Sequence, residues 1–211
     1  YAGTEVTANL TRGQTTELFH IGAGTTVTSN HPVQVQFMIG RYNGGTGNSS
    51  DSRSFTAVPS GLWESSYYNP VPGFSANNTD LFIYNPTRSD LTINYEDTGT
   101  GFFTVPARTT RSFRALSGHY VPPGSGVYLW ANQDFWVIGC VDPGVASFNW
   151  GFSLIPPTHL TDEYYLSWAP GSMDGTENTS PVFVTPVEDN TTFFVDYGPT
   201  NGTVDNTFTL D

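Results

Sequence analysis

Residues 59–73 read PSGLWESSYYNPVPG, and residues 157–171 read PTHLTDEYYLSWAPG. At one spacing of 98 residues, Pro59, Leu62, Tyr67 and Pro72-Gly73 fall on Pro157, Leu160, Tyr165 and Pro170-Gly171. Five identities in one register indicate an internal repeat. A repeat of about 100 residues has the size of one antiparallel β-sandwich domain, so the chain of 211 residues has room for two.

The composition predicts an all-β chain. Aromatic residues make up 15% of the sequence and charged residues only 12%, and there are 22 Gly and 15 Pro. This composition is typical of short strands joined by many turns and excludes a disordered chain. We therefore predict two Ig-like β-sandwich repeats.

The two repeats differ in continuity. Residues 80–95 predict two alternating strands around a turn, and residues 181–197 match them far better than any segment near Tyr1 does. Two further pairs of segments also match: residues 13–19 resemble residues 107–113, and residues 27–35 resemble residues 129–137.

One repeat is thus expected to be contiguous, over residues 79–178. The other is expected to be split between residues 180–211 and residues 1–78. Two alternatives remain open for the split repeat: both parts close within one molecule, or a strand from a neighbouring copy completes it.

The segment 3–12 is the candidate donor strand. It alternates, so that Val6, Ala8 and Leu10 share one face and Glu5, Thr7 and Asn9 share the other. A half-buried strand needs this pattern, and β-strand addition of the kind used by donor-strand pilins would provide the burial. The acceptor region is expected in the opening strands of the split repeat, at Val182, Phe183, Val184, Phe193, Phe194 and Val195.

Three short strings carry a family resemblance: residues 189–196 (DNTTFFVD), residues 28–35 (TSNHPVQV) and residues 152–157 (FSLIPP). They resemble the domain named for the N-terminal region of the IgG Fc-binding protein, which also occurs in bacterial surface proteins. The resemblance implies a secreted β-sandwich involved in surface adhesion or interaction. It does not imply antibody binding.

Charge and hydropathy limit the partners and the compartment. The seven basic residues are all Arg, and 19 acidic residues give a formal net charge of −12, which argues against nucleic-acid binding. No run of 18 apolar residues predicts a membrane span. Tyr1 opens into strand-like sequence without a signal-peptide pattern, so we expect a processed extracellular protein. The single cysteine, Cys140, lies in an apolar run and predicts a buried, inert thiol.

Covalent glycans are expected on this surface. Asn-x-Ser/Thr sequons occur at Asn9, Asn48, Asn77, Asn178, Asn190 and Asn201. No cofactor is predicted.

The sequence offers no catalytic or metal-binding pattern. It lacks a Gly-x-Ser-x-Gly elbow, and His20, His31, His119 and His159 are scattered without ligand spacing. Two aromatic clusters would suit stacking on sugars, although core and inter-domain packing is the favoured explanation. They are Trp63, Tyr67 and Tyr68 in one repeat and Tyr164, Tyr165 and Trp168 in the other.

The sequence therefore predicts a structural subunit of an extracellular bacterial fibre or pilus-like filament, a homopolymer assembled by donor-strand exchange of the N-terminal strand. A monomeric secreted adhesin or carbohydrate-binding module, with carbohydrate or host surfaces as partners, is the alternative. A secreted hydrolase is a distant third hypothesis.

Overall fold

The computed structural model describes residues 7–16, 21–39, 53–73, 78–142, 150–166, 182–196 and 204–210. These residues are predominantly β, which confirms the predicted class, and all pairs of named strands are antiparallel. The strands are β1 (Gln36–Ile39), β2 (Arg53–Thr56), β3 (Glu64–Asn69), β4 (Asn78–Tyr84), β5 (Leu91–Glu96), β6 (Thr100–Val105), β7 (Thr110–Ser112), β8 (Val127–Asp142), β9 (Trp150–Ser153), β10 (Thr191–Val195) and β11 (Asn206–Leu210). The helical turns are η1 (Ser60–Leu62), α1 (Phe113–Ser117) and η2 (Pro157–His159).

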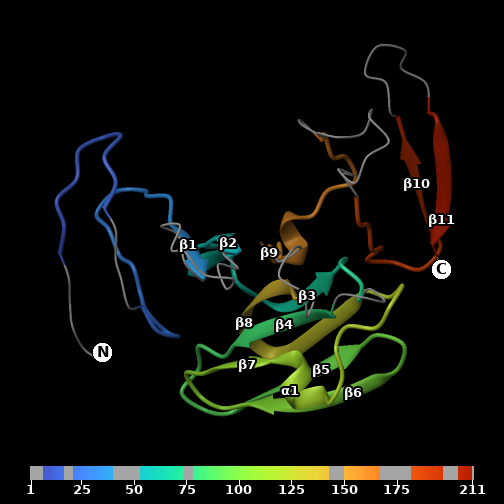
Figure 1. Ribbon diagram of the computed structural model, residues 1–211, viewed down its shortest axis with the longest axis horizontal. Coiled ribbons are helices and arrows are strands. Elements are labelled where there is room, and N and C mark those ends of the chain that lie inside the picture. The colour runs from blue at the N-terminus through green and yellow to red at the C-terminus, as the bar shows by residue number, and fades with distance from the viewer. Residues whose placement is uncertain are drawn as a thin grey trace, which may run out of the picture.

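The long strand β8 organises the largest sheet. Its first half lies between β3 and β5, and its second half lies between β4 and β9. β6 extends the sheet beyond β5, and β7 extends it beyond β4. A register shift opposite Glu64 and Ser66 marks an irregularity in the β3–β8 pairing. Such irregularities bend a strand, and the sheet curls as Figure 1 shows.

The main core lies inside this curled sheet. Most of its members are apolar side chains that β3, β4, β5, β6 and β8 direct to one side, as the alternation of residues in a strand requires. The larger ones are Tyr67, Leu81, Ile83, Leu91, Ile93, Phe103, Phe113, Leu129, Phe135 and Val137. Each of the fully buried apolar side chains contributes about 1.5–3 kcal/mol.

The short helix α1 closes one side of this core with Phe113. Ser112 caps the helix because its Oγ accepts the backbone N–H of Ala115 at 3.0 Å. Gly118, at a φ of 87°, ends the helix in the left-handed conformation that glycine adopts without strain.

A second, smaller cluster joins the hairpin β1–β2 to the sheet. Phe55 packs with Ile138 and Cys140, and Phe37 and Trp136 lie against them. The thiol of Cys140 is buried, as its apolar neighbours in the sequence predict.

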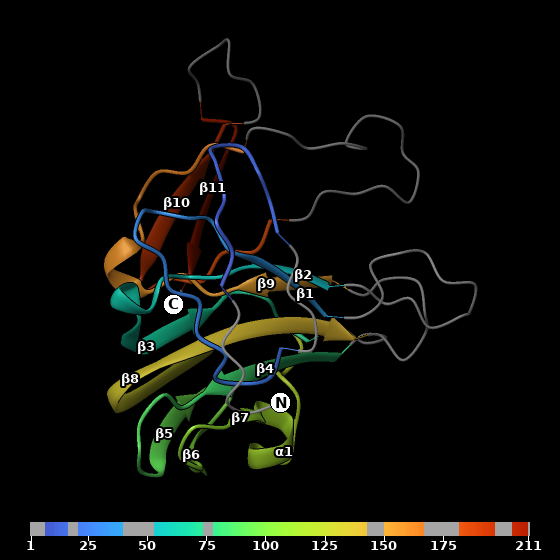
Figure 2. The ribbon, with the colours of Figure 1, turned by 90° about the vertical axis from the view of Figure 1, so that its left-hand side faces the viewer.

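Two parts of the chain lie outside the curled sheet and on opposite sides of it. Residues 7–16 and 21–35 lie to the left in Figure 1, and the hairpin β10–β11 lies to the right. The view turned by 90° shows β8 and its neighbours as a separate layer below β10 and β11 (Figure 2). β3 belongs to the segment before residue 79 but pairs with β8, which belongs to the segment after it. The boundaries of the two repeats stay a prediction.

Candidate assembly surface

In the C-terminal hairpin, β10 has a described strand partner, β11, on only one of its two edges. β11 pairs with β10 over five residues, and Phe193 stacks on Phe208 with ring centroids 5.2 Å apart. The hydroxyls of Thr192 and Thr209 lie 3.0 Å apart on the other face. No strand among the described residues pairs with the second edge of β10.

The hairpin β5–β6 pairs in the same register as β10–β11, but β5 has a strand partner on each of its two edges. Ile93 lies opposite Phe103 as Phe193 lies opposite Phe208, and Leu91 lies opposite Val105 as Thr191 lies opposite Leu210. On its other edge β5 pairs with β8, where Ile93 lies opposite Ala131. β8 thus supplies to β5 the partner that β10 lacks.

The hairpin β1–β2 matches the hairpin formed by β9 and the second half of β8. Phe37 lies opposite Phe55 in one, and Gly139 lies opposite Phe152 in the other. After three further residues, η1 follows β2 and η2 follows β9. By this match, residues 25–35, which directly precede β1, correspond to the first half of β8.

Residues 25–35 do not form a strand in this chain. Val27 and Val33 are exposed and Val35 is half-buried, whereas the matching side chains of β8 are buried. Val27 is 48% exposed and its match Leu129 is 0% exposed; Val33 is 58% exposed and its match Phe135 is 0% exposed. Apolar and polar residues alternate in this segment as in a buried strand, but no neighbouring strand among the described residues pairs with it.

The segment that follows η2 shows the same contrast. The Tyr67 hydroxyl accepts the backbone N–H of Glu64 at 3.2 Å, and the Tyr164 hydroxyl accepts that of Thr161 at the same distance. This bond matches Tyr67 with Tyr164, one residue before the match that sequence identity suggests. Tyr67 is buried in β3, but Tyr164 is 61% exposed, and residues 161–166 form no strand.

The candidate donor strand lies at the N-terminal side of this surface. Thr7, Ala8, Asn9 and Leu10 are exposed and lie outside any strand, and Glu5 and Val6 fall outside the described residues.

The turn after Leu10 also has a match. The N–H of Gln14 donates to the carbonyl of Thr11, as that of Thr109 does to Pro106. Gly13 and Arg108 hold the third position of the two turns at positive φ. This match assigns Leu10 to the position of Val105, the last residue of β6.

The candidate acceptor residues come from two segments. Val182 and Val184 are exposed, and Phe183 stacks on Trp150 of β9 at 6.3 Å. Within β10, Phe193 and Val195 are half-buried and Phe194 is exposed. Their acceptor role stays a prediction.

Two of the six sequons lie among the described residues. Asn9 is exposed, and Asn190 is exposed at a φ of 58° in the turn before β10. The others, Asn48, Asn77, Asn178 and Asn201, fall outside the described residues.

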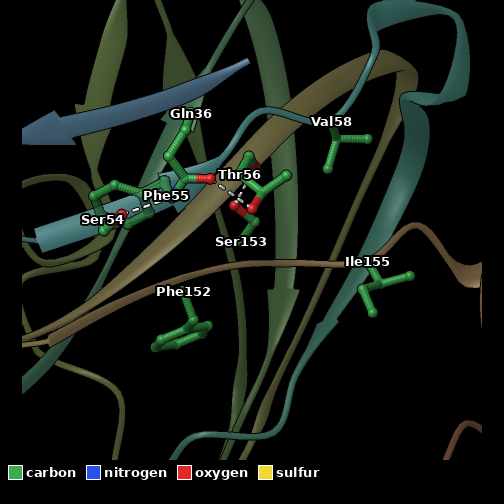
Figure 3. Close-up of a pocket in the computed structure, with 8 residues that line it drawn as sticks. All are labelled: Gln36, Ser54, Phe55, Thr56, Val58, Phe152, Ser153 and Ile155. Carbon is green, nitrogen blue, oxygen red and sulfur yellow. Dashed lines mark hydrogen bonds between the residues drawn. The ribbon is translucent and has the colours of Figure 1, made fainter. Parts of the chain in front are cut away.

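A hollow of about 410 Å³ lies between the matched hairpins (Figure 3). Three matched pairs contribute to its lining: Phe55 and Phe152, Thr56 and Ser153, and Val58 and Ile155. The Ser153 hydroxyl donates to the carbonyl of Thr56 at 2.7 Å, and the Gln36 amide bonds the hydroxyls of Ser54 and Thr56. These polar groups satisfy one another, so the hollow is explained by the packing of two similar hairpins.

The first aromatic cluster is also explained by packing. Trp63 stacks on Trp136 at 5.7 Å, and Tyr68 stacks on Tyr128 at 4.4 Å. In the second cluster Tyr164 and Tyr165 are exposed, and Trp168 falls outside the described residues.

Over the described ranges, no three His, Cys, Asp or Glu side chains gather as metal ligands would. The same residues contain no helix with the length and apolar character that a membrane crossing needs. Comparison with protein-family models, curated proteins and solved structures finds no match for this chain. The resemblance to the IgG Fc-binding protein domain therefore stays a prediction.

Proposed function

We propose that this chain is a structural subunit of an extracellular fibre, assembled head to tail by strand exchange between copies. In this proposal it contains one contiguous Ig-like β-sandwich, at residues 79–178, and the two parts of a split one. One observation carries the proposal: Val27 and Val33 of the split part are exposed, while their matches Leu129 and Phe135 in the contiguous part are buried.

The exposed side chains and the open edge of β10 favour association. Burying a side chain such as Val27 or Val33 contributes about 1.5–3 kcal/mol, and each new ladder hydrogen bond adds about 0.5–1.5 kcal/mol net. An unpaired edge beside apolar side chains is also a template for strand pairing. Completing the split sandwich provides both gains together.

The positions of the two parts favour completion by a neighbour. Phe37, next to the N-terminal segment, is held on Phe55, while Phe183, before β10, is held on Trp150. The N-terminal segment and β10–β11 lie on opposite sides of the curled sheet (Figure 1). A contact between different surfaces of two copies is heterologous, and it propagates into a filament unless it closes into a ring.

The candidate donor strand has a defined place in this assembly. Its match with β6 and β11 puts Val6, Ala8 and Leu10 where Asn206, Phe208 and Leu210 lie. The donor strand would therefore pair with β10 of a neighbouring copy. It would occupy the edge of β10 that β11 of that copy covers, and so displace that β11. Glycans on Asn9 and Asn190 and an extracellular location are part of the proposal.

The first experiment measures the mass of the full chain by light scattering and its shape by negative-stain microscopy. We expect filaments from the full chain and soluble subunits from a version that lacks residues 1–12. Leu10→Asp is expected to act like the deletion, because it places a charge on the face meant for burial.

Thr7→Asp is the matched control, since it adds the same charge to the opposite face of the same strand. It should assemble like the unchanged chain. A full chain that stays monomeric at all concentrations would contradict the proposal and favour the alternative, a self-contained secreted adhesin.

A further inference from the structure

The segment 25–35 is a second candidate for exchange, distinct from the N-terminal strand. In the curled sheet, the first half of β8 is inserted between β5 of the contiguous part and β3, which precedes that part in the chain. The matches of β5 and β3 are β10 and residues 161–166, and no described strand lies between them. The match of the inserted strand is residues 25–33, on the other side of the molecule (Figure 1).

We infer that residues 25–33 of a second copy insert between β10 and residues 161–166. This inference rests on the proposed assembly and assigns its main contact. The occupant is a second copy, because the same sequence pattern already performs this insertion once within each chain.

The complete pairing predicts the register of the exchanged strand. Asn94 lies opposite Trp130, and Tyr95 lies opposite Leu129. Transferred through the matches, Phe194 lies opposite Thr28 of the second copy, and Val195 lies opposite its Val27. Val27 then points to the inner face, as Leu129 does.

The Tyr164 hydroxyl gains a bond in this arrangement. The hydroxyl of Tyr67 donates to the carbonyl of Phe135 at 2.9 Å. In the second copy, Val33 matches Phe135, so the Tyr164 hydroxyl donates to its carbonyl. Pro32 matches Asp134, a residue of β8 next to the register shift where no ladder bond to β3 is needed.

Two chains with one added cysteine each test the register. We would mix Thr28→Cys with Phe194→Cys under mild oxidation and detect the disulfide-linked dimer by mass spectrometry. Each chain carries only one of the two new thiols, so this link joins different molecules. The unchanged chain, with its buried Cys140, gives the background.

The matched control mixes Thr26→Cys with Phe194→Cys. Directly opposed residues meet disulfide geometry, whereas residues shifted by two along the strand lie about 7–8 Å away. We expect at least about tenfold more link from the Thr28 pair than from the Thr26 pair.

Other results would overturn the inference in recognisable ways. Filaments without the Thr28–Phe194 link, or with a stronger Thr26 link, would reject the insertion and leave the fibre proposal intact. A double variant that carries both Thr28→Cys and Phe194→Cys and links within a monomer would show closure inside the molecule. A chain that never assembles and never links would reject the fibre proposal as well.

Discussion

Tyr67 shows how a single buried hydroxyl stabilises the curled sheet. It is fully buried, and its hydroxyl donates to the carbonyl of Phe135 at 2.9 Å, which ties β3 to β8. Burial raises the pKa of Tyr67 to about 12, because the charged phenolate would lose its hydration. The hydrogen bond and the burial both favour the neutral form.

Tyr67→Phe is expected to lower the free energy of unfolding by about 1 kcal/mol at pH 7. The pKa is higher in the folded state than in the unfolded state, so the contribution of the hydroxyl is complete below about pH 10 and is lost as the pH approaches 12. At about 1.4 kcal/mol per pH unit, this group accounts for a loss of up to about 3 kcal/mol. Urea unfolding at pH 7, 9 and 11 measures it.

The difference in the free energy of unfolding between the unchanged chain and Tyr67→Phe should therefore narrow or reverse at high pH. A difference in the free energy of unfolding that stays constant from pH 9 to pH 11 would contradict the raised pKa of Tyr67. Tyr164→Phe is the control, because the exposed Tyr164 should not affect the stability of the subunit.

Among the elements, the packing of the hairpin β1–β2 on β9 depends on a glycine. A Cβ atom at Gly151 would collide with the ring of Phe55. Phe55 also stacks on Phe37 at 5.0 Å and belongs to the smaller core. The absence of a side chain at Gly151 lets the two matched hairpins lie face to face.

Gly151→Ala is expected to destabilise the subunit by about 1–3 kcal/mol, because the Phe55 ring must shift. Gly61→Ala is the control, since a Cβ there meets nothing within 4 Å. Urea unfolding followed by tryptophan fluorescence compares the two. Equal stabilities would show that the hairpins do not depend on this contact.

At the scale of the whole molecule, folding and assembly depend on different apolar residues. The buried clusters hold the curled sheet, while exposed residues such as Val27 and Val33 contribute little to the isolated chain. Substitutions at the exposed positions should therefore change assembly without changing the subunit.

Val27→Asp is expected to abolish filaments while the urea midpoint of the subunit stays unchanged. In the inferred insertion Val27 faces the inner side, where an unpaired carboxylate is strongly unfavourable. Thr26→Asp places the same charge on the outer face and should assemble. Light scattering distinguishes them, and filaments from Val27→Asp would argue against burial of this residue.

The sequence alone was sufficient for the all-β class and for much of the local structure. Alternating residues at 91–95 and 191–195 predict strands, and both are strands in the structure. The repeated pattern at Pro59 and Pro157 lies directly before η1 and at the first residue of η2. Such features depend on neighbouring residues, so their patterns are readable locally.

Only the tertiary structure decided how the matched segments are used. The sequence matched Tyr67 with Tyr165, but the hydrogen bonds match it with Tyr164. Alternation also could not tell that β3 pairs with β8, whereas residues 161–166 and 25–35 remain outside any sheet. Alternation determines which face of a strand is apolar. The choice of edge depends on contacts between residues far apart in the chain, and these exist only once the chain has folded.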